Sequence, residues 1–327
     1  MFDLDRIGSV SVGVLGDLAV DIYWYADMKK SELSRETPHY PLPVVREVMS
    51  PGAGGNLTAN IAALIPKKLA VCGIIGDDWR GTILEKLLRD LGCDTSGLVL
   101  EAGRFTHAYC KPMRMGISDV IYEDPRIDFA SSEPPCAESE DKVIRWLDSI
   151  DGELDVLCVC DQFNGGIVTP KVLARLSRMK TTVMVDSRYK IGSYTVSGVL
   201  KPNEDECRGA LAKLGEEIPD DPAKMAKQLR KITGADILLT LGEHGSIYVT
   251  DDGIIPTPAF AAEGEIDICG AGDSSLSAFA CSTAAGAKPA EAAKIAAAAS
   301  RVTVKKIGMT GTASRDEIRN ILTENEI

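Results

Sequence analysis

Residues 267–279 read DICGAGDSSLSAF, a stretch that predicts a tight turn followed by a helix. The turn at its centre consists of Gly270, Ala271 and Gly272. The residues that follow, 271–285, are rich in Ala and Ser and predict a helix that starts at the turn. Just before the turn, residues 266–268 predict the end of a strand. A glycine-rich turn between a strand and a helix directs backbone N–H groups toward one point, which binds anions and phosphate above all.

Asp273 follows the turn and falls in the first turn of the expected helix, beside the anion site. A carboxylate in that place is suited to accept the proton of a hydroxyl group that attacks a phosphorus atom. The alternative is an acidic residue that only stabilises the helix N-terminus through the helix dipole. The spacing by itself leaves these two interpretations equally open.

The composition describes a folded protein with an acidic surface. The chain has 327 residues, of which 45% are hydrophobic and 26% charged, and its formal net charge is −12. This charge disfavours nucleic acids and anionic membrane surfaces as partners. The acidic N-terminal residues do not resemble a signal peptide, no run of 18 apolar residues is present, and the nine cysteines lack zinc-ligand spacing. We therefore expect a cytoplasmic protein with reduced thiols and no membrane contact.

Short apolar runs alternate with helical patterns along most of the chain. The runs that predict buried strands are 9–16, 69–76, 156–160, 182–186 and 237–241, and the helical patterns are 56–64, 79–91, 170–179, 204–214 and 222–232. Such alternation predicts a three-layer α/β/α fold with a mostly parallel sheet. We expect a single domain over residues 1–327. Ligands of such folds bind beyond the carboxyl ends of the strands.

Two long stretches interrupt this alternation. Residues 21–50 are rich in aromatic residues and Pro and show no helical period, and residues 105–129 alternate like antiparallel strands around Gly116. Insertions of this length are usually functional or form a subsidiary sheet. We expect the two stretches to form a small β-sheet lid over one mouth of the main domain.

Five elements of the sequence together resemble the ribokinase-like sugar kinases of the PfkB family. They are an early strand ending in Gly16–Asp17 with Asp21 beyond it, PGAGGN at 51–56, KPNEDE at 201–206, TLGEHG at 240–245, and DICGAGD at 267–273. Each element alone is a weak signal, whereas their common order and spacing are specific. The resemblance implies a ribokinase-like domain that transfers a phosphoryl group from ATP, with Mg²⁺, to a sugar or sugar phosphate.

The resemblance also implies roles for individual residues. Asp273 would be the general base, and the N–H groups of residues 270–272 would stabilise the transferring phosphoryl group. The sugar-binding residues would be Asp17, Asp21, Gly55 and Asn56. The nucleotide-binding residues would be Asn203, Thr240, Gly242 and Gly245, and Glu206 would hold Mg²⁺ through water. Simpler roles stay open for some of them, because Asn203 and Glu206 have the spacing of a helix capping box and Asp17 is suited to a strand-end turn.

The expected lid resembles more narrowly that of kinases that phosphorylate heptose 7-phosphate at its anomeric hydroxyl. Asp21 precedes the aromatic triplet YWY at 23–25, and RIDF at 126–129 is similar to the end of their second lid segment. The chain departs from their pattern by extra residues in TPHYPLP at 37–43 and by Ala53 where a glycine is usual. Because of these departures, the resemblance supports the PfkB family more strongly than it supports heptose 7-phosphate as the substrate.

The aromatic triplet also bears on assembly. Side chains alternate along a strand, so Tyr23 and Tyr25 should share one face and Trp24 should lie on the other. One face would cover the sugar, and the other would pack on a second subunit, because a small isolated sheet needs its far face buried. We therefore expect a homodimer that forms through the lids.

Two further features lie near the expected site. The cationic residues that would bind a phosphate on the sugar are Lys111, Arg114, Arg126 and Arg188, although solvated surface charge is the commoner role for any one of them. Cys269 stands where the family often has Thr, beside Asp267, near which the family often binds a monovalent cation. Whether K⁺ binds here stays open.

Other functions remain to be weighed. The same core would serve a kinase of ribose, fructose or a nucleoside. A weakly active sugar- or nucleotide-binding regulatory protein is disfavoured, because a pure binder has no need of the base Asp273. A dinucleotide-dependent dehydrogenase is disfavoured because no G-x-G-x-x-G follows the first strand.

Overall fold

The computed structural model describes residues 2–116, 118–308 and 310–325, which form two sheets and their covering helices. Sheet A has nine strands in the order β14-β13-β12-β11-β10-β9-β1-β4-β5. Its strands are β1 Ser11–Gly16, β4 Lys68–Gly76, β5 Asp94–Glu101, β9 Val156–Asp161, β10 Thr182–Ser187, β11 Gly198–Leu200, β12 Asp236–Thr240, β13 Ser246–Thr250 and β14 Gly253–Thr257. The pairs from β12 through β5 are parallel, and β13 and β14 add an antiparallel hairpin at one edge.

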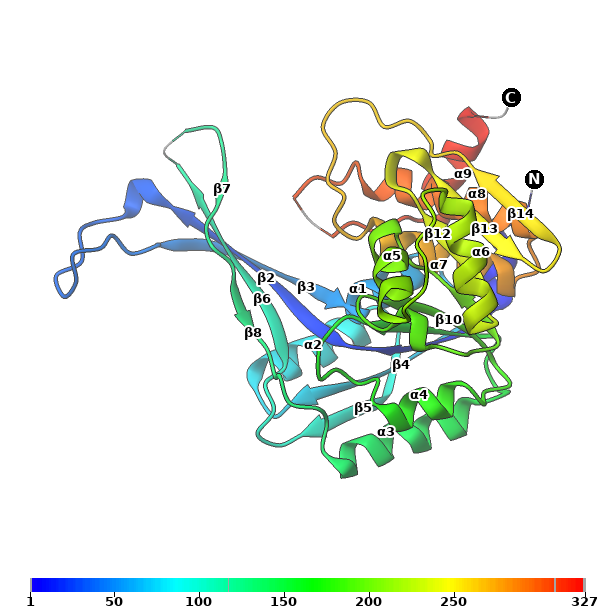
Figure 1. Cartoon of the computed structure of the whole chain (residues 1–327). Coiled ribbons are helices and arrows are strands. Elements are labelled where there is room, and N and C mark those ends of the chain that lie inside the picture. The colour runs from blue at the N-terminus through cyan, green and yellow to red at the C-terminus, as the bar shows by residue number, and fades with distance from the viewer. Residues whose placement is uncertain (1, 117, 309, 326–327) are drawn as a thin grey trace.

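Helices cover both faces of sheet A, as the alternation in the sequence predicts (Figure 1). One layer consists of α1 Gly54–Ala63, α2 Trp79–Asp90, α7 Ala271–Ala284, α8 Pro289–Thr303 and α9 Arg315–Glu324. The other consists of α3 Ala137–Ile150, α4 Pro170–Leu176, α5 Glu204–Lys213 and α6 Pro222–Thr233. Short 3-10 helices lie at Leu4–Ser9, Met28–Lys30, Ile191–Ser193 and Gly242–His244. The three-layer α/β/α fold is therefore confirmed.

Two hydrophobic clusters fill the spaces between the layers. Successive residues of a strand point to opposite faces, so Val14 belongs to the cluster with residues of α1 and α7, and Leu15 to the cluster with residues of α3 and α4. Cys158 and Val159 of β9 divide in the same way. The strands are thus buried on both faces, which explains why they read as continuous apolar runs.

Sheet B is built from the two stretches that interrupt the alternation in the sequence. Its strands are β2 Leu18–Asp27, β3 Val44–Ala53, β6 His107–Met115, β7 Tyr122–Glu123 and β8 Ile127–Phe129. Their order is β3-β2-β6-β7, and β8 also pairs with β6. Figure 1 shows this sheet rising from the edge of the main body, with its far end standing clear of it. The second sheet is confirmed, although its strands start earlier and end later than residues 21–50.

One expected strand is absent. Residues 258–268 form no strand, and the peptide N–H of Asp267 instead donates to the carbonyl of Val304, just beyond the end of α8 (2.8 Å). Ile266 and Ile268 have the alternating spacing of apolar residues in a strand, but their side chains are 48% and 76% exposed. An apolar pair without a neighbouring strand on which to pack does not form a strand.

The remaining general expectations concern the surface and the thiols. No helix in the described part of the chain has the length and apolar character needed to span a bilayer. The nine cysteines are free thiols, and all are buried except Cys136 and Cys269. The buried ones pack as small core residues.

Candidate active site

The turn before α7 has the conformation of an anion-binding loop. Gly270 adopts a left-handed conformation (φ +79°), and α7 begins at the next residue, so the first N–H groups of the helix lie beside the turn. A side chain on Gly270 would lie 2.9 Å from the Asn56 amide nitrogen, so the glycine also lets the turn approach α1 closely. The sequence predicted this turn and the helix that follows it.

Asp273 lies in the first turn of α7 and faces α1. Its Oδ2 accepts a hydrogen bond from Nδ2 of Asn56 (2.5 Å). Asn60, one turn further along α1, donates to the backbone oxygen of Asn56 (3.0 Å) and so helps to fix this arrangement. Two residues predicted from separate motifs, 217 positions apart in the chain, therefore meet in space.

Burial makes Asp273 an unusually weak acid. Desolvation raises the pKa of its carboxyl group to about 7, and repulsion from Asp186 adds to the effect, while the Asn56 hydrogen bond and the nearby Lys201 ammonium act against it. A carboxyl group with a pKa near neutrality is suited to take up and release a proton in the physiological range. Helix-dipole stabilisation alone would instead favour the charged form.

A buried ion pair that the sequence motifs did not predict lies beneath the anion-binding turn. Lys201, which precedes α5, lies 2.8 Å from Oδ2 of Asp186 at the end of β10. A side chain on Gly272 would lie 3.4 Å from the Lys201 nitrogen. The signal was available, because Lys201 opens the KPNEDE element and Asp186 ends a predicted strand, but only the fold brings them together.

The nucleotide-binding candidates form a second group at the carboxyl ends of β11 and β12. Asn203 caps α5 by accepting the N–H of Glu206, and Glu206 accepts the N–H of Asn203 (2.8 and 2.9 Å). The capping box is thus confirmed, and it leaves room for a second role. Thr240 reaches the same place, because its backbone forms a bridge with Asn203 and donates to the carbonyl of Pro202 (3.0 Å).

Gly242 and Gly245 shape the turn that follows Thr240. Both have positive φ values, +57° and +90°, and they flank the 3-10 helix between β12 and β13. A side chain on Gly245 would come within 2.1 Å of the carbonyl oxygen of Thr257, so only glycine fits there. Gly242 has open space around it.

A cavity of about 310 Å³ opens beside Asn203 and Glu206. Its lining includes the acidic Asp205 and Glu206 and the cationic Arg188 and Lys213, together with Asn203. Burial raises the pKa of Glu206, and repulsion from Asp186 adds to it. A cavity lined by separated cations and carboxylates suits a polyanion that carries a divalent cation.

The donor set fits Mg²⁺ that is held mainly through water. Carboxylate and amide oxygens are the ligands that Mg²⁺ prefers, and Glu206, Asp205 and Asn203 offer them at the cavity wall. Among the described residues, no three His, Cys, Asp or Glu side chains converge into a metal cage. Mg²⁺ commonly keeps several water molecules and binds substrate phosphates, so such a cage is not required.

Asp17 is held by the backbone of the loop between β9 and α4. Its carboxylate accepts N–H groups from Gln162, Phe163 and Ile167 at 2.7–2.8 Å. Burial raises its pKa to about 6, against the effect of these three hydrogen bonds. A side chain on Gly166 would lie 2.3 Å from the carboxylate, so the loop wraps closely around Asp17. The strand-end role of Asp17 is therefore realised, and its contact with a sugar stays a prediction.

The inner face of sheet B carries Asp21, Tyr23, Tyr109 and Lys111, because the strand register pairs Asp21 with Tyr109 and Tyr23 with Lys111. The Lys111 ammonium donates to the hydroxyl of Tyr23 (2.9 Å) and lies 3.6 Å from Oδ1 of Asp21. Burial raises the pKa of Asp21, and Lys111 opposes the shift. The alternation expected for the aromatic triplet is observed, since Trp24 packs toward the core cluster while Tyr23 faces Lys111.

Gly55 lies where the PGAGG loop turns into α1. A side chain there would lie 2.7 Å from the Cβ of Pro51, and one on Gly54 would lie 2.9 Å from the carbonyl oxygen of Asp17. The loop therefore packs tightly on the end of β1 and brings Asn56 toward Asp273. Ala53 adopts a positive φ of 50°, which a glycine would adopt more easily.

The four candidate phosphate-binding cations are not equivalent. Lys111 neighbours Asp21, Arg114 pairs with Asp124 (2.7 Å), and Arg126 pairs with Asp128 (2.6 Å) and lies over the Tyr109 ring. Arg188 lies instead at the cavity beside Glu206. The structure thus divides them between sheet B and the nucleotide-binding candidates.

Comparisons with known proteins agree with this geometry. Residues 189–315 match the sequence profile of the pfkB family carbohydrate kinase. Over 322 residues the chain is 31% identical to the Bifunctional protein HldE of Trichlorobacter lovleyi, which covers 96% of this chain and 63% of the relative. Residues 189–315 belong to a carbohydrate kinase domain of the pfkB family. The HldE protein of Wolinella succinogenes is 30% identical over 94% of this chain and 64% of its own length. The kinase domain thus spans about 63% of the length of these curated relatives.

Solved structures share the fold of the kinase domain at low sequence identity. Phosphofructokinase-2 from Escherichia coli, solved with substrates and products, superposes with a TM-score of 0.74 at 19% identity, over 96% of this chain and 99% of that one. Ribokinase from Thermotoga maritima gives a TM-score of 0.69 at 19% identity, over the same shares of the two chains. The ribokinase-like fold is therefore confirmed.

Proposed function

We propose that this protein transfers the γ-phosphoryl group of ATP to a hydroxyl group of a sugar or sugar phosphate. The observation that carries the proposal is Asp273, a carboxyl group with a pKa of about 7 in the first turn of the helix behind an anion-binding turn. A base and an oxyanion site side by side are the two parts that phosphoryl transfer to a hydroxyl group requires. The family to which the kinase domain belongs supports the same reaction.

In this mechanism Asp273 accepts the proton of the attacking hydroxyl group. Asn56 orients the carboxylate through its hydrogen bond, and Lys201 lowers the energy of its charged form. The N–H groups of residues 270–272 and the Lys201 ammonium would face the negative charge on the transferring phosphoryl group. When bound near Glu206, Mg²⁺ would neutralise charge on the phosphates of the nucleotide. The chain itself supplies position and charge rather than a covalent intermediate.

Heptose 7-phosphate, phosphorylated at its anomeric hydroxyl, is the substrate we favour. The support is the resemblance of the lid in Asp21, residues 23–25 and residues 126–129. Lys111 and Arg126 lie at sheet B, where they would meet a phosphate on the far end of the sugar. Each already has an acidic neighbour, so a bound phosphate would share them with Asp21 and Asp128.

A homodimer through sheet B is the assembly we favour. Several large apolar side chains of this sheet are 44–50% exposed, and they are Val44, Val45, Tyr122 and Ile127. A small sheet of this kind needs a covered face to be stable, and a second copy presents the same apolar residues. Sedimentation velocity at micromolar concentration should give a dimer, and Val45→Lys should shift it toward monomer. A monomeric wild-type protein would rule the dimer out.

ADP production with a panel of acceptors tests the proposed reaction. The panel is heptose 7-phosphate, fructose 6-phosphate, ribose, fructose and adenosine, each with ATP and Mg²⁺. We expect the highest kcat/KM for heptose 7-phosphate, and a kcat lowered by about 10²–10⁴ in Asp273→Asn. A higher kcat/KM for another acceptor would reject heptose 7-phosphate and keep the kinase. ATP binding without turnover of any acceptor would favour the regulatory binding protein instead.

A further inference from the structure

Arg104 connects the lid to the loop that holds Asp17. It lies in the turn between β5 of sheet A and β6 of sheet B, where the chain passes from one sheet to the other. Its side chain is 5% exposed. A buried guanidinium group needs partners for its donors, and the identity of these partners shows what it holds together.

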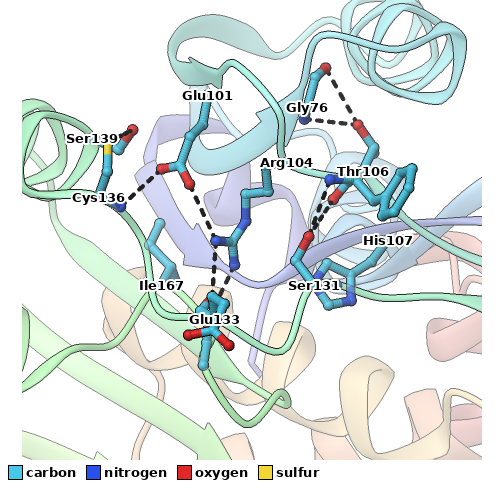
Figure 2. Close-up of polar contacts among 12 residues, drawn as sticks. Gly76, Glu101, Arg104, Thr106, His107, Ser131, Glu133, Cys136, Ser139 and Ile167 are labelled. Atoms are coloured by element: carbon cyan, nitrogen blue, oxygen red, sulfur yellow. Dashed lines mark hydrogen bonds and ion pairs between the residues drawn. The ribbon is translucent and has the colours of Figure 1, made fainter.

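The Arg104 guanidinium contacts three separate segments (Figure 2). It donates to the carbonyl of Glu133 in the segment between β8 and α3 (3.1 Å), and to the carbonyl of Gly165 in the β9–α4 loop (3.0 Å). It also lies 3.4 Å from Oε1 of Glu101 at the end of β5. The other oxygen of Glu101 accepts the N–H of Cys136 (3.1 Å), which ties the segment after β8 a second time.

The segments that Arg104 joins also touch backbone to backbone. A side chain on Gly165 would lie 2.4 Å from the carbonyl oxygen of Ser132. One on Gly76 would lie 2.0 Å from the carbonyl oxygen of Arg104 itself. Only glycine permits these approaches, so the segment after β8 packs closely on the β9–α4 loop, and the turn that carries Arg104 packs closely on the end of β4.

The β9–α4 loop contacts Asp17 on one side and the lid on the other. Its N–H groups at 162, 163 and 167 hold the Asp17 carboxylate. The ring of Phe163 stacks on His107 at the start of β6 (centroids 4.0 Å apart) and meets the edge of Tyr109 on the inner lid face (6.4 Å). The loop is therefore the part through which Arg104 affects both Asp17 and the lid.

We propose that Arg104 is a positioning residue that fixes the β9–α4 loop, and through it Asp17 and the base of the lid, in the arrangement that binds the acceptor. The proposal rests on the proposed function, because it assigns this arrangement to the acceptor rather than to the nucleotide. Arg104 belongs to neither group of candidate binding residues, and it acts through the loop. Its loss should therefore weaken acceptor binding far more than nucleotide binding.

The first test measures kinetics of Arg104→Met. We expect the KM for heptose 7-phosphate to rise tenfold or more, while the KM for ATP changes less than twofold. The matched control is Arg230→Met, which removes a partly buried arginine that pairs with Asp236 and Asp251 far from the loop. This control should leave both KM values unchanged. Equal increases of both KM values, or no increase, would overturn the proposal.

The second test needs no activity. Amide hydrogen exchange of residues 162–167 in the ligand-free protein should accelerate tenfold or more in Arg104→Met and stay unchanged in Arg230→Met. Unchanged exchange in this loop would overturn the proposal, even if activity fell. If wild type phosphorylates no acceptor while the exchange still accelerates, the proposed function fails and the structural connection stands.

A third variant tests the proposal in case Arg104→Met does not fold. Arg104→Lys keeps the charge but cannot bridge two carbonyl groups and a carboxylate as a planar guanidinium does. We expect an intermediate rise in the KM for heptose 7-phosphate and intermediate exchange in residues 162–167. Wild-type values for both in Arg104→Lys would show that charge alone matters, and this would overturn the proposal.

Discussion

Replacing Asp273 with asparagine should stabilise the ligand-free protein while it removes catalysis. Asparagine keeps the size of the side chain and an oxygen that can accept the hydrogen bond from Asn56. It removes the negative charge that burial and Asp186 disfavour. The perturbation therefore separates the folding cost of this carboxylate from its chemical use.

The size of the effect follows from the pKa of Asp273, about 7 in the folded protein against an ordinary 3.8. A difference of about 3 units corresponds to about 4 kcal/mol as an upper limit. The side chain is only half-buried, so solvent screens part of this cost, and we expect about 1–3 kcal/mol.

The direction in which the free energy of unfolding changes with pH follows from proton binding. Below about pH 3 the carboxyl group is protonated in both states, and it costs the folded protein nothing. As the pH rises toward 7 the unfolded chain ionises first, so the folded protein loses stability relative to it. Above pH 7 the full cost is present. Asp273→Asn should therefore raise the free energy of unfolding at pH 8, and by only about a quarter as much at pH 4.5.

Thermal unfolding and turnover, measured on the same preparations, check the gain in stability and the loss of catalysis. The Tm of Asp273→Asn should exceed that of wild type by several degrees at pH 8, and the gap should close toward pH 4.5. The control is Asp252→Asn in the exposed β13–β14 turn, for which the Tm should not change at either pH. Loss of a general base should lower kcat by about 10²–10⁴, and wild-type kcat/KM should fall below about pH 7.

Two results would contradict this prediction. Phosphoryl transfer by Asp273→Asn within tenfold of wild type would show that another group, or none, takes the proton. An equal Tm difference at pH 4.5 and pH 8 would show that the asparagine acts through packing and that the carboxylate is not strained by burial. The first result concerns the mechanism and the second the pKa, so either can fail alone.

Two further substitutions test the charges around the site. Glu206→Gln should raise the Mg²⁺ concentration for half-maximal activity with little change in the KM for the acceptor; an unchanged Mg²⁺ dependence with a damaged acceptor KM would place Glu206 in the wrong site. Lys201→Met should lower the Tm, because it leaves Asp186 unpaired and buried, and should move the acid limb of the kcat/KM profile to higher pH, because Lys201 lowers the pKa of Asp273. An unmoved acid limb would contradict this role of Lys201.

The main sheet could be predicted from the sequence because burial on both faces gives a signal that needs no partner. Strands such as β9 are continuous apolar runs, and amphipathic helices such as α6 separate them. Residues 266–268 show where this reasoning fails. Their apolar alternation is a local property, whereas a strand also requires a neighbour with free backbone groups.

The candidate site was predictable where residue type and spacing carry the chemistry. The turn at 270–272, Asp273 and the capping box at Asn203 are local patterns. Lys201 with Asp186, and the loop that holds Asp17, depend instead on which strands lie side by side in sheet A. The three N–H groups that bind Asp17 belong to the backbone, so no residue type in the sequence predicts them.

Asp17 and Asp273 both have a raised pKa, but replacing each carboxylate with a neutral amide should change the stability of the protein differently. Burial raises the pKa of Asp17 to about 6, so Asp17→Asn would relieve up to about 3 kcal/mol of charge cost at pH 8. However, Asp17 accepts N–H groups on both oxygens, two on Oδ2 and that of Ile167 on Oδ1.

Asparagine has one oxygen, so its amide group would face at least one of these donors and leave it unsatisfied. An unsatisfied buried donor costs about 1–3 kcal/mol, which offsets the relief of charge. We therefore expect Asp17→Asn to leave the Tm at pH 8 unchanged or lower it, whereas Asp273→Asn, which loses no acceptor, raises it. A rise in Tm as large in Asp17→Asn as in Asp273→Asn would show that the three backbone donors do not hold Asp17. Asp17 would then be free to turn toward an acceptor without the β9–α4 loop.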